Sequence, residues 1–246
     1  MRDYKEEAQK RVEFIKDILK NSGAKGIIYG NSGGKDCTLV GILCKMATDN
    51  VLGVMMPCQS KRNYTEDIED GLNAAKQFGI ETVTVDLTEA KVALKSAVER
   101  VYPVNGLADA NMNPRLRMIT LYSLAQERGY LVAGTGNRSE RYMGYFTKWG
   151  DGACDFNPIS DLTVKEIYEF LRYLKAPENI IAKAPSAALY EGQTDEKEMG
   201  ISYEKIDNYL LTGVGKKEDV ELIDKAFRRS SHKRRMPAFY KETDGE

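Results

Sequence analysis

Short apolar runs alternate with amphipathic stretches along the chain, and each run has the length of a buried strand. The pattern predicts strands over residues 25–29, 51–56, 81–86 and 130–134, and helices over residues 3–21, 65–78, 88–101, 203–211 and 217–230. Strands that alternate with helices indicate an α/β protein, a Rossmann-like doubly wound parallel sheet with helices on both faces. Ligands of such sheets bind at the carboxyl ends of the strands, where the winding reverses, and the first strand is the natural switch point.

A glycine-rich loop follows the first predicted strand and runs into an apolar helical pattern. Glycines let the backbone turn tightly and bring bare N–H groups close to phosphate oxygens, and a helix N-terminus adds about half a positive charge. Asp36 suits a Mg²⁺ ion that rides on the phosphates. A tight turn without a ligand is the alternative. We therefore expect an anion site formed by Gly30, Asn31, Ser32, Gly33, Gly34, Lys35, Asp36 and Cys37.

A polar, glycine-bearing run, residues 134–140, follows the fourth predicted strand and should lie at the same edge of the sheet. Glu140 in this run is a candidate second carboxylate for a metal held by Asp36. A carboxylate that merely begins a helix is the equally open alternative.

Residues 102–113 are predicted to form a loop, after which Pro114 opens a helix at its first position. Arg115 and Arg117 then lie in the first helical turn, where they oppose the helix dipole. A carboxylate or phosphate ligand would offset that cost, and a solvated surface arginine is the alternative.

Three later segments have binding-site compositions. Residues 144–155 hold three glycines, Lys148, the only tryptophan and two aspartates, which is typical of a binding loop, although an ordinary surface loop is the alternative. Residues 183–201 are long for a simple connection, and we expect a mobile lid. The basic cluster of His232, Lys233 and Arg234 ends the last predicted helix, where a solvated helix end is the alternative.

Composition narrows the functional classes. The net charge of −1 gives no overall attraction to nucleic acid or to an anionic membrane. No apolar stretch approaches eighteen residues and no signal-peptide pattern opens the chain, so we expect a cytoplasmic protein. The four cysteines, which form no CxxC pair, are typical of reduced thiols rather than of a disulfide framework or a zinc site.

The loop sequence Ser-Gly-Gly-Lys-Asp resembles the phosphate loop of ATP pyrophosphatases, in which a serine usually replaces Cys37. With six further motifs in family order, the chain resembles the ammonia-dependent NAD⁺ synthetases, whose fold is adenine nucleotide alpha hydrolase-like. These motifs are Asn111–Met118, Gly134–Glu140, Phe146–Gly152, Ala184–Leu189, Gly192–Tyr203 and His232–Arg234.

The resemblance implies a role for individual residues. Gly30 to Cys37 would hold the ATP phosphates, with Asp36 and Glu140 on Mg²⁺. Further ATP contacts would come from Thr135, Ser186 and position 164, where the family often has a lysine and this chain has Val164 followed by Lys165. Deamido-NAD⁺ would contact Arg115, Lys148, Asp155, His232 and Lys233. Asp36, Lys148 and Asp155 would be the catalytic residues.

The implied reaction is the last step of NAD⁺ biosynthesis. Deamido-NAD⁺ is activated by ATP as an NAD-adenylate with loss of pyrophosphate, and ammonia then gives NAD⁺ and AMP. We expect one synthetase domain over residues 1–246 without a glutaminase domain, and hence free ammonia as nitrogen donor. The family implies a homodimer with deamido-NAD⁺ at the interface, for which the first helix and residues 113–129 are candidates.

Two other functions remain as hypotheses at this stage. A tRNA-thiolating or GMP-synthetase-like pyrophosphatase shares the phosphate loop, but a thiolase would be expected to show paired cysteines and a basic RNA surface. A regulatory module that binds nucleotide without turnover is the second. Release of AMP together with NAD⁺ separates the synthetase from both.

Overall fold

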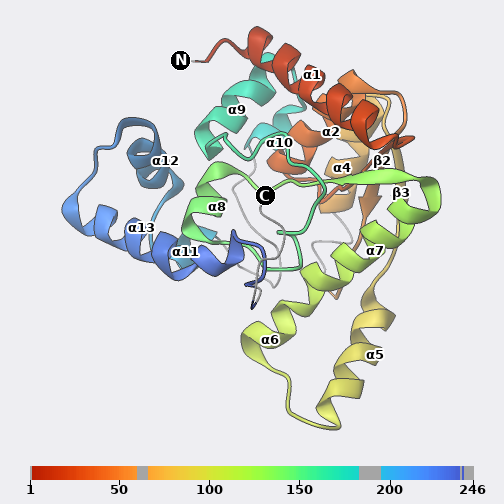
Figure 1. The fold of residues 1–246 in the computed structure, drawn as a ribbon, viewed down its shortest axis with the longest axis vertical. Coiled ribbons are helices and arrows are strands. Elements are labelled where there is room, and N and C mark those ends of the chain that lie inside the picture. The colour runs from red at the N-terminus through yellow and green to blue at the C-terminus, as the bar shows by residue number, and fades with distance from the viewer. Residues whose placement is uncertain (1, 60–65, 183–194, 239, 241–246) are drawn as a thin grey trace.

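The computed structural model describes residues 2–59, 66–182, 195–238 and 240, which form a parallel sheet flanked by helices (Figure 1). The strands are β1 (Gly26–Gly30), β2 (Val51–Met55), β3 (Glu81–Thr84) and β4 (Tyr130–Ala133), in the order β3-β2-β1-β4. All three strand pairs are parallel. The chain winds outward from β1 to β3 and then returns to the other side of β1, which confirms the doubly wound sheet with β1 at the switch point.

Helices cover both faces of the sheet because β1 is apolar on both. Ile27 and Tyr29 pack in a cluster with α1 (Tyr4–Ser22), α2 (Lys35–Ala47) and α9 (Val164–Tyr173). Ile28 packs in a second cluster, which includes Ala125 of α7 (Met112–Arg128). Successive side chains of a strand point to opposite faces, so one five-residue strand is the centre of both cores.

The N-terminal helix α1 begins and ends close to its predicted limits. The side chain of Asp3 accepts hydrogen bonds from the amides of Lys5 and Glu6, and Gly23 ends the helix with φ 70°. The apolar face of α1 packs inside the molecule against α2, with Ile15 fully buried. Within one chain, the apolar face of α1 is therefore used for internal packing.

A third apolar cluster lies beside the sheet, and the C-terminal helices pack in it. Its buried centre consists of Met143 of α8 (Arg138–Met143), Ile206 of α12 (Tyr203–Thr212) and Ile223 of α13 (Lys217–Arg229). The other helices of the described residues are α4 (Glu66–Gln77), α5 (Thr88–Glu99), α6 (Gly106–Ala110), α10 (Glu178–Ala182) and α11 (Asp195–Met199), and a 3₁₀ turn at Ser231–Lys233 follows α13. None of the described helices is long and apolar enough to cross a bilayer.

Two predicted loops contain helices. Residues 102–113 include α6, and α7 begins at Met112, so Pro114 is its third residue rather than its first. Proline is tolerated there because no amide of the first helical turn has a partner within the helix. The predicted lid of residues 183–201 contains α11 at its end, and residues 183–194 lie outside the described part of the chain.

Candidate active site

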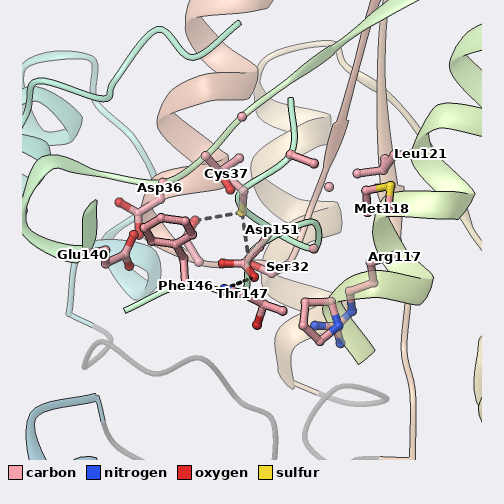
Figure 2. A pocket seen from close by; sticks show the side chains of 18 of the residues that line it. Ser32, Asp36, Cys37, Arg117, Met118, Leu121, Glu140, Phe146, Thr147 and Asp151 are labelled. Carbon is pink, nitrogen blue, oxygen red and sulfur yellow. Dashed lines mark hydrogen bonds between the residues drawn. The ribbon is translucent and has the colours of Figure 1, made fainter. Parts of the chain in front are cut away.

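The carboxyl ends of β1, β2 and β4 open into one cavity of about 580 Å³ (Figure 2). Most of the predicted site residues line it, although they come from five separate segments of the chain. They are Gly30, Asn31, Ser32, Gly34, Lys35, Asp36, Cys37, Arg115, Thr135, Glu140, Lys148, His232 and Lys233. The fold thus gathers the glycine loop, a pair of acids and several cationic side chains around one space.

The loop between β1 and α2 is held open by its own backbone and by one amide side chain. Gly33 has φ 70°, a conformation that side chains other than glycine rarely adopt. The buried Asn31 accepts a hydrogen bond from Gly33 N (3.2 Å) and donates one to Gly71 O (3.1 Å). Gly34 is the N-cap residue of α2, and no side chain caps this helix. The first amides of α2 are therefore available to an anionic ligand.

The Cys37 side chain is hydrogen-bonded within this loop. Its thiol donates to Gly34 O at 3.1 Å, and its Sγ lies 3.4 Å from Ser32 Oγ. Burial raises the pKa of the Cys37 thiol, so the group stays protonated and is a poor nucleophile. The cysteine that replaces the usual serine therefore serves to hold the loop.

Asp36 and Glu140 lie beside one another at one end of the cavity (Figure 2). Asn137 joins them: its side-chain amide donates to Asp36 Oδ1 (3.2 Å) and its backbone N–H donates to Glu140 Oε2 (3.1 Å). Burial, and then the charge of Asp36, raise the pKa of Glu140 well above its usual value. A cation bound between the two carboxyl groups would stabilise the ionised form of Glu140.

This acidic pair fits Mg²⁺ in its donor chemistry. Magnesium prefers oxygen ligands and usually takes one or two carboxylates together with substrate phosphates and water. Among the residues that the structure describes, no three acidic, histidine or cysteine side chains gather into a metal-binding group. A metal held by these two carboxylates would have its other coordination positions open to phosphate and water.

The segment that carries Lys148 is fixed to the C-terminal end of the described chain by Lys233. The Lys233 ammonium donates to Gly144 O (2.8 Å) and Phe146 O (2.7 Å) and lies 5.3 Å from the Phe146 ring centroid. Burial lowers the pKa of Lys233. Lys233 thus positions the segment in addition to lining the cavity.

Gly144 lies against Ser230, and its substitution tests how firmly these two segments are joined. Gly144→Ala is expected to lower the free energy of unfolding by about 2–4 kcal/mol, because the residue has φ 68° and a Cβ would overlap the Ser230 side chain. Gly213→Ala is the matched control, with φ 73° at a helix end and nothing within 4 Å, and should cost about 1 kcal/mol. Urea unfolding of both variants measures the difference, and equal losses would contradict it.

Asp151 is a site residue that the sequence did not single out from its loop. Its carboxylate lines the cavity and accepts a hydrogen bond from Thr147 N at 2.9 Å. The residue is exposed to solvent, and the protein packed around its carboxyl partly desolvates the group and raises its pKa. Its place between Gly150 and Gly152, three residues after Lys148, was the available signal.

Asp195 is a second acid of the site, and its role was also missed. It begins α11, is 3% exposed and accepts a hydrogen bond from Tyr203 Oη at 3.0 Å. Its position in a predicted lid concealed that it packs at the cavity wall beside Lys35 and Glu140.

Three of the predicted residues that the structure describes, Gly33, Asp155 and Val164, are not among those that line the cavity. The Asp155 carboxylate accepts hydrogen bonds from Val132 N (2.7 Å) and Tyr122 Oη (3.2 Å), on the α7 side of β4. Val164 is buried at the start of α9, and its amide donates to Ser139 Oγ at 3.3 Å. Ser186 lies outside the described residues.

Comparison with known proteins agrees with the fold and with the motifs. A family model described as NAD synthase matches residues 7–237. The NH(3)-dependent NAD(+) synthetase of Carboxydothermus hydrogenoformans is 47% identical over 96% of this chain and 97% of its own. The solved NMN synthetase of Francisella tularensis has a TM-score of 0.91 at 34% identity, over 97% of this chain and 99% of that one. The NH3-dependent NAD synthetase of Campylobacter jejuni has a TM-score of 0.80 at 30% identity, over 98% and 100%. The chain belongs to the NAD synthase family.

Proposed function

We propose that this member of the NAD synthase family converts deamido-NAD⁺, ATP and ammonia into NAD⁺, AMP and pyrophosphate. One observation carries the proposal: a single cavity joins a bare-amide glycine loop, the Asp36–Glu140 pair and the cationic side chain of Lys148. Each is needed for one part of an adenylate-forming amidation. The match to the family and the relative that is 47% identical to this chain support the same activity.

The first half of the reaction activates the nicotinate carboxylate. A carboxylate does not acylate ammonia by itself, because oxide is a poor leaving group. ATP phosphates bound to residues 30–37 present the α-phosphorus to the carboxylate, which attacks it and displaces pyrophosphate. Mg²⁺ held by Asp36 and Glu140 would supply positive charge to the departing pyrophosphate. The amides at the start of α2 stabilise the same charge.

The second half forms the amide. Ammonia attacks the activated carbonyl carbon, the C–O bond to the phosphate breaks, and AMP leaves with the electron pair. Lys148 at the cavity wall is placed to stabilise the negative charge that develops on the adenylate. The attacking nitrogen loses a proton as the C–N bond forms, and Asp151, whose raised pKa suits it to hold one, is the carboxylate that we assign to accept it. Asp155 faces Val132 and Tyr122 instead.

Asp151→Asn should therefore separate the two half-reactions. We expect the rate of NAD⁺ formation to fall about 10²-fold, while ATP–pyrophosphate exchange with deamido-NAD⁺ in the absence of ammonia is retained. Asp155→Asn is the control, because its hydrogen bonds are structural, and should change both rates in parallel. Parallel loss of both rates in Asp151→Asn would remove its assignment as proton acceptor.

We also propose that the synthetase domain over residues 1–246 uses free ammonia as its nitrogen donor. The chain covers 97% of a relative named for NH(3) dependence. Purified protein should form NAD⁺ with ammonium and not with glutamine. Equal rates with glutamine would contradict the proposal.

The protein is proposed to act as a cytoplasmic homodimer with deamido-NAD⁺ at the subunit interface. α7 is the better interface candidate, because α1 uses its apolar face internally while Ile119 of α7 is 55% exposed. The four free cysteines suit a reducing compartment. Ile119→Glu should convert a dimer to a monomer in light scattering, and a dimer of unchanged mass would exclude α7.

A second candidate acceptor is nicotinate mononucleotide, whose amide is NMN. It is favoured by the TM-score of 0.91 with an NMN synthetase, against 0.80 with an NAD synthetase. The 47% identity to an NAD(+) synthetase favours deamido-NAD⁺.

One assay tests both candidates. Purified protein with ATP, Mg²⁺ and ammonium is given either acceptor, and AMP and amide are measured together. We expect equimolar AMP and NAD⁺, with the larger kcat/KM for deamido-NAD⁺. A larger kcat/KM for the mononucleotide would make the chain an NMN synthetase, and nucleotide binding without AMP would make it a regulatory module.

A further inference from the structure

Lys35 places its ammonium against one of the two carboxylates that we assign to the metal. Its Nζ lies 2.7 Å from Asp36 Oδ2, and its side chain is 7% exposed. The Tyr203 ring centroid is 5.8 Å from the same nitrogen. A lysine is seldom buried to this degree unless its charge is paired, so Asp36 is the reason that Lys35 stays inside the cavity wall.

Both oxygens of Asp36 already accept a hydrogen bond. Oδ2 accepts from Lys35 and Oδ1 accepts from the Asn137 side-chain amide at 3.2 Å. A divalent cation that binds Asp36 must approach one of these oxygens. It repels the cationic Lys35 and not the neutral Asn137, so the ion pair with Lys35 is the contact that must give way.

We propose that Lys35 is a tethered counter-ion of the metal site, which pairs with Asp36 when no metal is bound and competes with the entering divalent cation. The proposal rests on the proposed function, because that function assigns Asp36 and Glu140 to Mg²⁺. Lys35 weakens the binding of metal alone, and the negative charge of the ATP phosphates offsets this effect. Metal therefore binds effectively only together with nucleotide.

Two further acids line the cavity near Lys35. Asp195 lines the same cavity and is hydrogen-bonded to Tyr203, the ring that Lys35 faces. Glu140 also lines the cavity beside Lys35. Of these two acids, Asp195 is the one that is not assigned to the metal.

Titration with Mn²⁺ alone, followed by the electron paramagnetic resonance signal of the free ion, tests the proposal without any turnover. Lys35→Met removes the charge and keeps an unbranched chain, and should bind Mn²⁺ at least about tenfold more tightly than the wild type. Lys91→Met is the matched control, since Lys91 is also buried and pairs with Asp109 at 3.5 Å but is not among the cavity residues. It should leave the Mn²⁺ affinity unchanged.

A second pair of measurements separates charge from packing. Lys35→Arg keeps the charge and should retain the weak Mn²⁺ binding of the wild type, whereas Lys35→Gln, a second neutral variant, should bind tightly. Mg²⁺ alone should raise the melting temperature of Lys35→Met more than that of the wild type, because the metal supplies the positive charge beside Asp36 that the substitution removes. Unchanged or weaker Mn²⁺ binding in both neutral variants would overturn the proposal.

A different result would reassign the residue. If both neutral variants lose ATP affinity while their Mn²⁺ affinity equals that of the wild type, Lys35 is a phosphate ligand and the proposal fails. NAD⁺ formation by the wild-type preparation is measured in parallel. Its absence would refute the proposed function, whereas the Mn²⁺ comparison would still decide the role of Lys35.

Discussion

Asp36→Ala is expected to abolish pyrophosphate release, with kcat lowered by at least about 10³-fold. The substitution removes a carboxylate that lies at the helix start beside the phosphate loop and next to Glu140, where the metal would bind. A coupled pyrophosphate assay with saturating ATP and deamido-NAD⁺ measures the effect. Circular dichroism and thermal unfolding check that the fold is intact.

The same helix offers a matched control for this variant. Asp49→Ala removes an acid at the other end of α2, where the side chain is 98% exposed and pairs with Lys45 at 2.9 Å. Its turnover should equal that of the wild type. Unchanged turnover in Asp36→Ala would refute the metal role of Asp36.

Lys148→Ala should lower kcat by about 10²–10³-fold, because it removes the cation that faces the developing adenylate charge. Lys148 lines the cavity, and its Nζ lies 5.3 Å from the centroid of the exposed Trp149 ring. Steady-state kinetics with both substrates saturating gives the change.

Lys217→Ala is the control for loss of a lysine as such, since its side chain is 88% exposed on α13. We expect wild-type kinetics from it. A wild-type kcat in Lys148→Ala would remove this residue from the chemistry and leave it as a binding contact.

The sheet was predictable from the sequence because β1, β2 and β4 are short apolar runs, and because Val83 and Val85 alternate with polar residues around β3. Ile27, Ile28 and Tyr29 are buried on both faces of the sheet, and this requires an uninterrupted apolar pattern. The location of the cavity followed from the same pattern, since parallel strands bring their carboxyl ends to one edge. The family resemblance is confirmed, and the individual ligand contacts stay predictions.

The details of the loops were not predictable, because tertiary contacts determine them. The choice between Asp151 and Asp155 depends on which hydrogen bonds form: Thr147 N binds the first, and Val132 N binds the second. No periodic pattern encodes that choice. The start of α7 depends in the same way on Asn111, whose side chain accepts a hydrogen bond from Thr147 Oγ1 at 2.7 Å.

Lys35 shows the limit of reading a motif by residue type. A lysine in a phosphate loop is expected to contact phosphate, and its neighbour Asp36 is expected to bind metal. The structure pairs the two side chains with each other at 2.7 Å. That pairing is visible only in the folded structure, since side chains adjacent in a helix usually point in different directions.

The transfer of carboxylate oxygen tests the central claim most directly. Deamido-NAD⁺ labelled with oxygen-18 in its nicotinate carboxylate is converted with ATP and ammonia, and the products are analysed by mass spectrometry. If the carboxylate attacks the α-phosphorus over the glycine loop, one labelled oxygen appears in AMP and none in pyrophosphate. Label in inorganic phosphate with formation of ADP, or AMP without label, would contradict the account.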